Sequence, residues 1–174
     1  MIGNPKLIFL IGFMGSGKTS VGKKLASLLP AEFVDLDEVI EQEEGKTISE
    51  IFQQQGEEYF RDRESQCLKS LFKKSNTVIA TGGGAPCFHD NMKWMNENGI
   101  TVYLKADPEI LFKRLKSEIA HRPLLQGNSE SELKKFIALK LSERRQFYTA
   151  SQITVEAGDK NEDEIARHIL SLLS

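Results

Sequence analysis

The stretch KLIFLIGFMGSGKT, residues 6–19, decides the fold of this chain. Its apolar run from Leu7 to Ile11 is typical of a strand that is buried on both faces of a parallel sheet. The octet that follows, GFMGSGKT, matches the G-x-x-x-x-G-K-[ST] pattern of a phosphate-binding loop between a strand and a helix. Val21, Leu25 and Leu28 continue it at helical spacing. We therefore predict a nucleotide-binding domain of the α/β class.

Each part of this loop has a chemical task. Its glycines let backbone N–H groups turn toward phosphate oxygens at the positive N-terminal end of the helix. The ammonium group of Lys18 is expected to reach the β- and γ-phosphates, and the hydroxyl of Thr19 to bind Mg²⁺. The nucleotide site is predicted at Gly12, Gly15, Ser16, Gly17, Lys18, Thr19 and Ser20.

Strand and helix patterns alternate along the rest of the chain. Further strands are predicted at 33–35, 77–81, 101–104 and 153–155. Helical patterns lie between them, and the longest, from residue 47 to about 72, breaks near Gly56. Alternation of this kind predicts a three-layer α/β/α domain around a five-stranded parallel sheet, spanning residues 1–174. Ligands of such sheets bind beyond the carboxyl ends of the strands.

Composition limits the classes of partner. The 174 residues suit one domain, and a net charge of −2 gives no reason to expect a nucleic-acid-binding surface. No apolar run is long enough to cross a bilayer. Cys67 and Cys87 match neither a disulfide framework nor a metal-ligand spacing, so we expect reduced thiols in a cytoplasmic protein.

Two aspartates follow the second predicted strand, at the edge where ligands bind. One carboxylate near Thr19 suits Mg²⁺, which keeps several waters, and we assign this role to Asp35. Asp37 could orient or deprotonate an acceptor hydroxyl. An alternative reading is that Asp37 only caps a helix that begins at Glu38.

Arg61 lies beside the apolar stripe of the long helical segment, within reach of Glu57 and Glu64. A guanidinium held in this way can bind a small carboxylate through two hydrogen bonds. A solvated run of charges is the alternative. Arg122 falls in an aperiodic segment, which makes it a candidate lid residue that closes over the γ-phosphate.

Two later features complete the pattern. Three glycines, 82–84, follow a strand and allow a ligand to approach the backbone closely. Arg144 and Arg145 precede Tyr148 near the end of a helix, and in isolation such a pair more often faces solvent than a ligand.

Taken together, these motifs resemble those of the shikimate kinase family over nearly the whole chain. The matching segments are residues 12–19, 35–37, 57–64, 82–84, 122–125 and 144–148. The resemblance implies a P-loop kinase fold with an acceptor-binding helical insert at about 38–72 and a lid at about 119–131. It departs from the family's usual pattern at Gln146 and at Glu162, two positions where the family often has proline.

The resemblance also implies roles. Asp37, Arg61, Arg144 and the backbone at Gly83 and Gly84 are similar to the family's shikimate contacts, with both arginines on the carboxylate. Arg114 is similar to the residue that packs on adenine, and Arg122 to the lid arginine that contacts the phosphoryl group. Lining of the acceptor pocket is implied for Phe52 and Phe60. The catalytic residues would be Lys18, Asp37 and Arg122.

The implied activity is ATP- and Mg²⁺-dependent phosphorylation of shikimate to shikimate 3-phosphate, a step of aromatic amino-acid biosynthesis through chorismate. We expect a monomer with these small-molecule substrates, and no membrane or nucleic acid as partner. The alternative is a kinase of the same architecture acting on gluconate or another small hydroxy acid.

Overall fold

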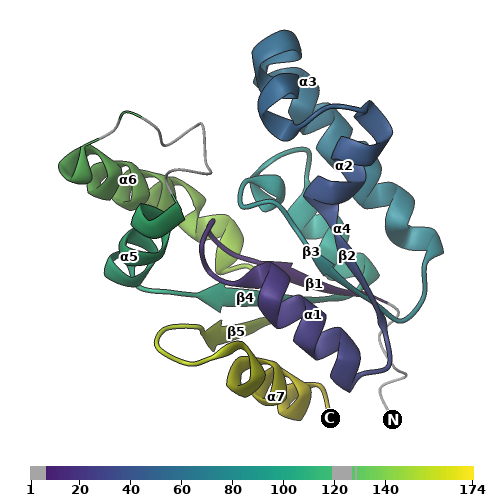
Figure 1. The fold of residues 1–174 in the computed structure, drawn as a ribbon. Helices are drawn as coiled ribbons and strands as arrows, with labels where there is room; N and C mark the ends of the chain where they lie inside the picture. Colours follow the sequence, from purple (N-terminus) through teal and green to yellow (C-terminus); the bar gives the residue numbers. More distant parts are fainter. Residues whose placement is uncertain (1–6, 119–126, 128) are drawn as a thin grey trace.

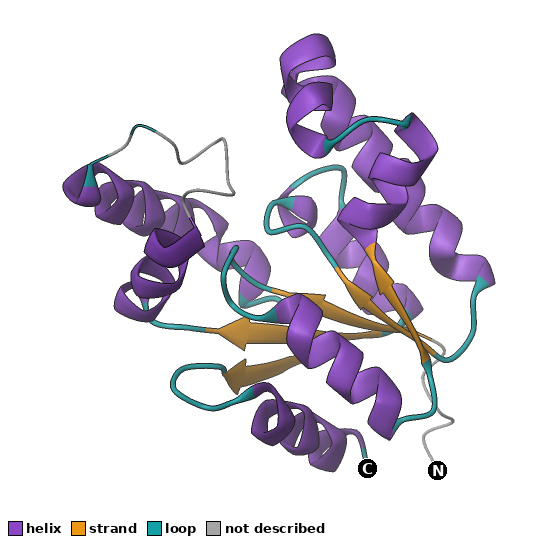
Figure 2. Cartoon of the chain, viewed as in Figure 1, coloured by secondary structure: helices purple, strands orange, loops and turns teal. Residues whose placement is uncertain are grey.

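The computed structural model describes residues 7–118, 127 and 129–174 (Figure 1). A central sheet carries helices on both faces (Figure 2). The strands are β1 (Leu7–Ile11), β2 (Glu32–Asp35), β3 (Thr77–Ala80), β4 (Ile100–Lys105) and β5 (Ile153–Glu156). The α-helices are α1 (Lys18–Leu28), α2 (Leu36–Glu44), α3 (Ile48–Ser70), α4 (Asn91–Asn98), α5 (Pro108–Glu118), α6 (Glu130–Tyr148) and α7 (Glu162–Leu173). Two short 3₁₀ turns, η1 (Leu71–Lys73) and η2 (Ala85–Cys87), flank β3.

The sheet is parallel throughout, in the order β2-β3-β1-β4-β5. Its central strand β1 pairs with β3 on one side and with β4 on the other. The predicted five-stranded parallel sheet is therefore confirmed. Because β1 lies in the middle, the phosphate loop that follows it opens at the centre of the sheet's carboxyl edge.

Alternate residues of β1 divide between two hydrophobic clusters. Phe9 and Ile11 belong to the cluster under α3, α4, α5 and α6. Ile8 and Leu10 belong to the cluster formed with α1 and α7, which pack against each other. Side chains of successive strand residues point to opposite faces, so one buried strand anchors both outer layers.

The predicted break in the long helix is present in α3. Gly56 has φ 84° and ψ 171°, values outside the helical region, and helical structure resumes at Glu57. The helix starts with a capping box in which Thr47 and Glu50 exchange hydrogen bonds. The helices α2 and α3 pack against each other, and α2 also contacts β2 (Figure 1).

One sequence alternative is wrong. Asp37 does not cap a helix that begins at Glu38, because α2 begins at Leu36 and its N-cap is Asp35. The carboxylate of Asp35 accepts a hydrogen bond from the backbone N–H of Asp37. Capping by Asp35 leaves the carboxylate of Asp37 available for other contacts.

Gly99, between α4 and β4, allows a test of the packing on β1. A Cβ atom at this position would lie 2.4 Å from the carbonyl oxygen of Leu7, whose strand is held on both sides. Gly99→Ala should therefore lower the free energy of unfolding by about 1–3 kcal/mol, measured by denaturant titration. Gly158→Ala is the control, since its Cβ would meet only a side-chain methyl of Ile110 at 3.3 Å. Equal stability of the two variants would contradict this account.

Candidate active site

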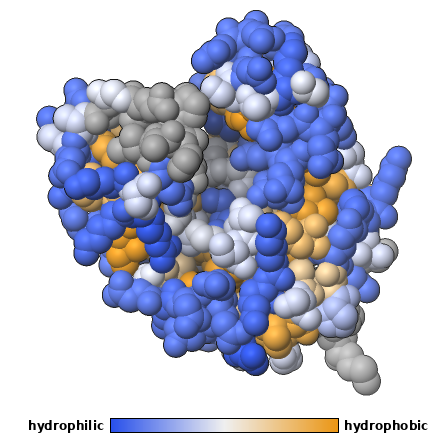
Figure 3. All heavy atoms as spheres, in the orientation of Figure 1, coloured by the Kyte–Doolittle hydropathy of each residue, from blue (hydrophilic) through white to orange (hydrophobic). Residues whose placement is uncertain are grey.

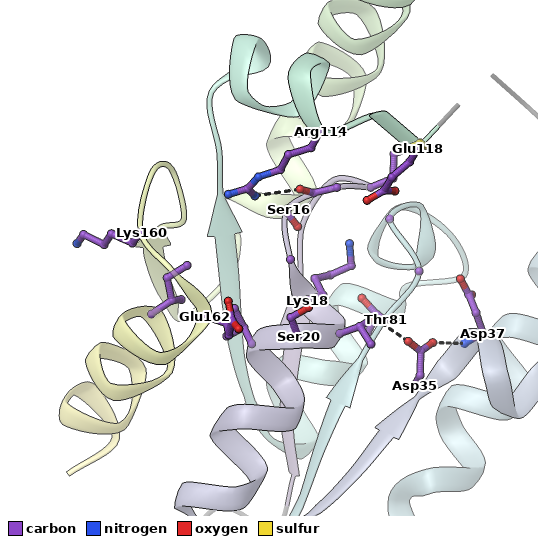
Figure 4. A pocket seen from close by; sticks show the side chains of 18 residues that line it. Ser16, Lys18, Ser20, Asp35, Asp37, Thr81, Arg114, Glu118, Lys160 and Glu162 are labelled. Carbon is purple, nitrogen blue, oxygen red and sulfur yellow. Dashed lines mark hydrogen bonds between the residues drawn. The ribbon is translucent and has the colours of Figure 1, made fainter. Parts of the chain in front are cut away.

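A pocket of about 460 Å³ opens at the carboxyl edge of the sheet (Figure 4). The phosphate loop, the ends of β2 and β3, α5 and α7 all contribute to its walls. Figure 3 shows the face of the molecule hollowed between α3 and the α5–α6 pair. The predicted site residues that line the pocket are Gly15, Ser16, Gly17, Lys18, Thr19, Ser20, Asp35, Asp37, Gly83 and Arg114.

The phosphate loop is folded as an anion cradle. Lys18 Nζ donates to the carbonyl oxygens of Gly12 and Phe13, at 2.8 and 2.9 Å, which holds the ammonium group over the loop. The hydroxyl oxygen of Ser16 is buried with no hydrogen-bond partner among the described residues. The first turn of α1 contains no acidic residue. Together these features favour a bound phosphate at the helix N-terminus.

The side-chain oxygens of Thr19 and Asp35 lie together beside the loop. The Thr19 hydroxyl donates to Asp35 Oδ2 at 2.9 Å. Within the described part of the chain, no cluster of three or more His, Cys, Asp or Glu side chains could hold an ion. A hydroxyl and one carboxylate fit Mg²⁺, which completes its octahedral shell with water and phosphate oxygens.

Asp37 points into the same pocket from the first turn of α2 (Figure 4). Burial, and secondly the nearby carboxylate of Asp35, raise the pKa of Asp37 from 3.8 to about 6, against the lowering effect of Lys18. A carboxylate with this pKa is ionised at neutral pH and basic enough to accept a proton from a hydroxyl group. Its position next to Lys18 puts it close to where a phosphoryl group would lie.

Arg61 is a buried arginine on α3, at 8% relative exposure. Its Nη1 donates to Glu64 at 2.8 Å, and the Glu64 side chain is also buried. Burial raises the pKa of Glu64 above its ordinary value, and Arg61 counteracts this effect. The alternative of a solvated charge run is wrong for Arg61, because its guanidinium group is enclosed and held in place.

The three glycines allow these charged groups to approach the backbone. A Cβ atom at Gly84 would lie 2.6 Å from Nη2 of Arg61, and one at Gly82 would lie 2.8 Å from Oε1 of Glu64. A Cβ at Gly83 would lie 3.2 Å from Nη1 of Arg144. A side chain at 84 would therefore displace Arg61, which is predicted to bind the acceptor, and one at 82 would displace Glu64, which holds Arg61.

Arg144 and Arg145 have different surroundings. Arg144 is half-buried, with its guanidinium carbon 5.5 Å from the ring centroid of Phe13 in the phosphate loop. Arg145 is exposed. Tyr148, one helical turn beyond Arg144, is fully buried and donates from its hydroxyl to the carbonyl oxygen of Gly83 at 2.6 Å. Of the two arginines, the site therefore contains Arg144.

Phe52 and Phe60 lie side by side on α3, on either side of the break at Gly56. Their ring centroids are 4.6 Å apart, and the Phe60 ring is 5.1 Å from the guanidinium carbon of Arg61. The two rings thus form an apolar wall next to the arginine.

Arg114 on α5 joins the phosphate loop to the loop that follows β5. Its guanidinium group donates to the carbonyl oxygens of Gly15, Ala157 and Gly158 at 3.0, 3.3 and 2.8 Å. Lys160 and Glu162 also line this end (Figure 4). These three hydrogen bonds fix the flat guanidinium group at this end of the pocket.

Comparisons with known proteins agree with this geometry. A family model described as shikimate kinase matches residues 14–174. A shikimate kinase of Parabacteroides distasonis is 49% identical over 152 residues, which cover 87% of this chain and 88% of that protein. The chain belongs to the shikimate kinase family. A solved shikimate kinase from Bacteroides thetaiotaomicron superposes with a TM-score of 0.92 at 41% identity, covering 97% of this chain and 98% of that one. A shikimate kinase from Acinetobacter baumannii, solved in complex with shikimate, superposes with a TM-score of 0.89 at 37% identity. The superposition covers 97% of this chain and 92% of that one.

The predicted membership of the shikimate kinase family and the P-loop kinase fold are thereby confirmed. Arg122, and most of the lid predicted at about 119–131, lie outside the described residues. No helix among residues 7–118 and 129–174 is long and apolar enough to cross a membrane.

Some residues of the site were not predicted. Thr81 and Glu118 line the pocket, and Tyr148 holds the glycine turn through its hydrogen bond to the carbonyl oxygen of Gly83. Thr81 could have been predicted from its position. It is a polar residue that directly follows β3 at the carboxyl edge of the sheet, just as Asp35 is a polar residue at the end of β2. The hydrogen bond from Tyr148 to Gly83 joins residues far apart in the sequence, so it depends on tertiary packing that no local pattern indicates.

The raised pKa of Asp37 gives a test based on stability. Between about pH 4 and 6 the native state keeps a proton that the unfolded chain has released, so the free energy of unfolding falls as pH rises. Asp37→Asn removes this penalty. It should raise the free energy of unfolding by about 1–2 kcal/mol at pH 7.5, with no gain near pH 4.

Denaturant titrations at several pH values measure this difference. Glu38→Gln, which removes the same charge from the exposed neighbouring position of α2, should show no such pH dependence. A stabilisation by Asp37→Asn that is constant from pH 4 to 7.5 would rule out the buried charge as its cause.

Proposed function

We propose that the protein transfers the γ-phosphoryl group of ATP to a hydroxyl group of shikimate, giving shikimate 3-phosphate and ADP for aromatic amino-acid biosynthesis. One observation carries this proposal. Two arginines, Arg61 and Arg144, converge on the glycine turn at 82–84, which borders the phosphate loop. Such a pair suits a small carboxylate held beside the phosphoryl group.

The nucleotide is proposed to bind along the phosphate loop, with its base toward Arg114. Lys18 would release its loop carbonyls and bind the β- and γ-phosphates, aided by the backbone N–H groups and by Ser16 and Ser20. Thr19 and Asp35 would hold Mg²⁺, directly or through water. When bound, the ion supplies positive charge that offsets the charge of the phosphates.

The acceptor is proposed to lie between Asp37 and the two arginines. Arg61 and Arg144 would bind its carboxylate, the backbone at Gly83 and Gly84 would contact it, and the rings of Phe52 and Phe60 would line its apolar side. Its reacting hydroxyl would then face Asp37, which orients it and accepts its proton. Positioning of this kind accounts for much of the catalysis in phosphoryl transfer.

Arg122 is proposed to close over the transferred group, on the basis of its place in the sequence. An arginine that arrives with the lid stabilises charge in the transition state and excludes water. We further propose a monomer that acts in the cytoplasm on these small molecules alone. Cys67 and Cys87 are both free, in keeping with that compartment.

The first test is the choice of acceptor. With Mg²⁺ and ATP, ADP release followed by a coupled assay should require shikimate, because shikimate carries a carboxylate for the two arginines and a hydroxyl group for Asp37. Gluconate and a nucleoside monophosphate are the comparison substrates. Faster turnover with either of them would overturn the proposal in favour of the corresponding kinase.

The second test separates the two neighbouring arginines of α6. Arg144→Ala should weaken shikimate binding by about 1.5–3 kcal/mol, the usual cost of losing a hydrogen bond to a charged group. Arg145→Ala should leave the affinity within about twofold, because this side chain is exposed. Calorimetric titration of each variant with shikimate, and separately with ADP, measures the two affinities. An equal loss for the two variants, or a loss confined to ADP, would remove Arg144 from the acceptor site.

A further inference from the structure

The guanidinium group of Arg61 is enclosed on most sides by groups that cannot easily move. Nη1 is held by the buried carboxylate of Glu64 at 2.8 Å. The Nη1–Nη2 end lies against Gly84, so closely that a Cβ there would come within 2.6–2.8 Å of both nitrogens. The aromatic rings of Phe88 and Phe60 lie 4.3 and 5.1 Å from its central carbon.

The remaining edge of Arg61, formed by Nε and Nη2, is held by Glu57. Both nitrogens donate to the same oxygen, Oε1, at 3.3 Å. These contacts are longer than the 2.8 Å bond to Glu64, and one oxygen serves both donors where a bidentate carboxylate would use two. The Glu57 side chain is 59% exposed, whereas that of Glu64 is 1% exposed.

The two acidic partners of Arg61 therefore differ in how readily they can leave. Releasing Glu64 would leave a buried charge without its partner, which is costly. Releasing Glu57 exposes its carboxylate to water, and exposed ion pairs contribute little. Glu57 is also the first residue after the break at Gly56, at the N-terminal end of a helical segment, where a negative charge is favourable in either position.

We propose that the carboxylate of Glu57 occupies, in the empty site, the position on Arg61 that the carboxylate of the acceptor takes on binding. It holds the Nε–Nη2 edge of Arg61 while the site is empty, and the acceptor displaces it on binding. This inference rests on the proposed function, in which Arg61 binds that carboxylate. Glu57 then lowers the affinity for every acidic acceptor by a fixed factor, and it keeps Arg61 in its binding orientation between turnovers. A neutral acceptor cannot replace it on Arg61.

The test compares Glu57→Gln with Glu58→Gln. Glu58 is the exposed neighbour on the same helix, so its variant removes an equal charge without touching the described contacts of Arg61. Calorimetric titration of the nucleotide-free protein with shikimate should give a dissociation constant lower by roughly two- to fivefold for Glu57→Gln, the range that an exposed ion pair spans. Glu58→Gln should match the parent protein, and a thermal melt confirms that both variants are folded.

Two further measurements exclude a general effect of charge or structure. The carboxamide analogue of shikimate, which carries no negative charge, should gain nothing from Glu57→Gln. In an Arg61→Ala background the gain with shikimate should vanish, since the two residues act through one contact. An unchanged or weaker affinity for shikimate in Glu57→Gln, or an equal gain in Glu58→Gln, overturns the inference while leaving the proposed function intact. Failure of the parent protein to bind shikimate overturns the proposed function itself.

Discussion

The close approach of charged side chains to bare backbone at residues 82–84 is the constraint on which the site depends. Glu64, Arg144 and Arg61 come from α3 and α6. A Cβ at 82 or 84 would collide with Glu64 or Arg61, and one at 83 would lie in tight contact with Arg144. The turn leaves β3 beside the phosphate loop that follows β1. Two helices far apart in the sequence can thus bring their charges to one point next to bound phosphate. No other residue type at 82 or 84 would keep this arrangement.

This arrangement is unfavourable for the empty protein. Burial raises the pKa of Asp37 and that of Glu64. In addition, one carboxylate oxygen of Glu64 has no hydrogen-bond partner among the described residues. Buried charges of this kind are weak contributors to stability even when paired. The large apolar clusters on the two faces of the sheet compensate for this cost. One of them includes Phe13, Phe60 and Tyr148, so the core extends directly under the site.

Sequence reasoning succeeded where the signal is local. The phosphate loop, the strand ends and the break at Gly56 each follow from residue type and spacing, and all lie where predicted. The residue pattern alone did not separate Arg144 from Arg145, which only the resemblance distinguished, because their exposure is set by how α6 packs in the fold. It also treated Glu57 and Glu64 alike, since both lie within one turn of Arg61 along the helix. Only the fold makes one carboxylate buried and the other exposed.

The pairing of α5 with α6 has a consequence for how the two substrates influence each other. These helices pack together, and a salt bridge joins Lys116 on one to Glu130 on the other. Arg114, at the nucleotide end, belongs to α5, whereas Arg144 and the Tyr148 anchor to Gly83 belong to α6. Any small rotation of this pair moves both arginines at once. If nucleotide and acceptor bind these two arginines as proposed, such a rotation would link their binding energies, and reciprocity requires that each then changes the affinity of the other by the same factor.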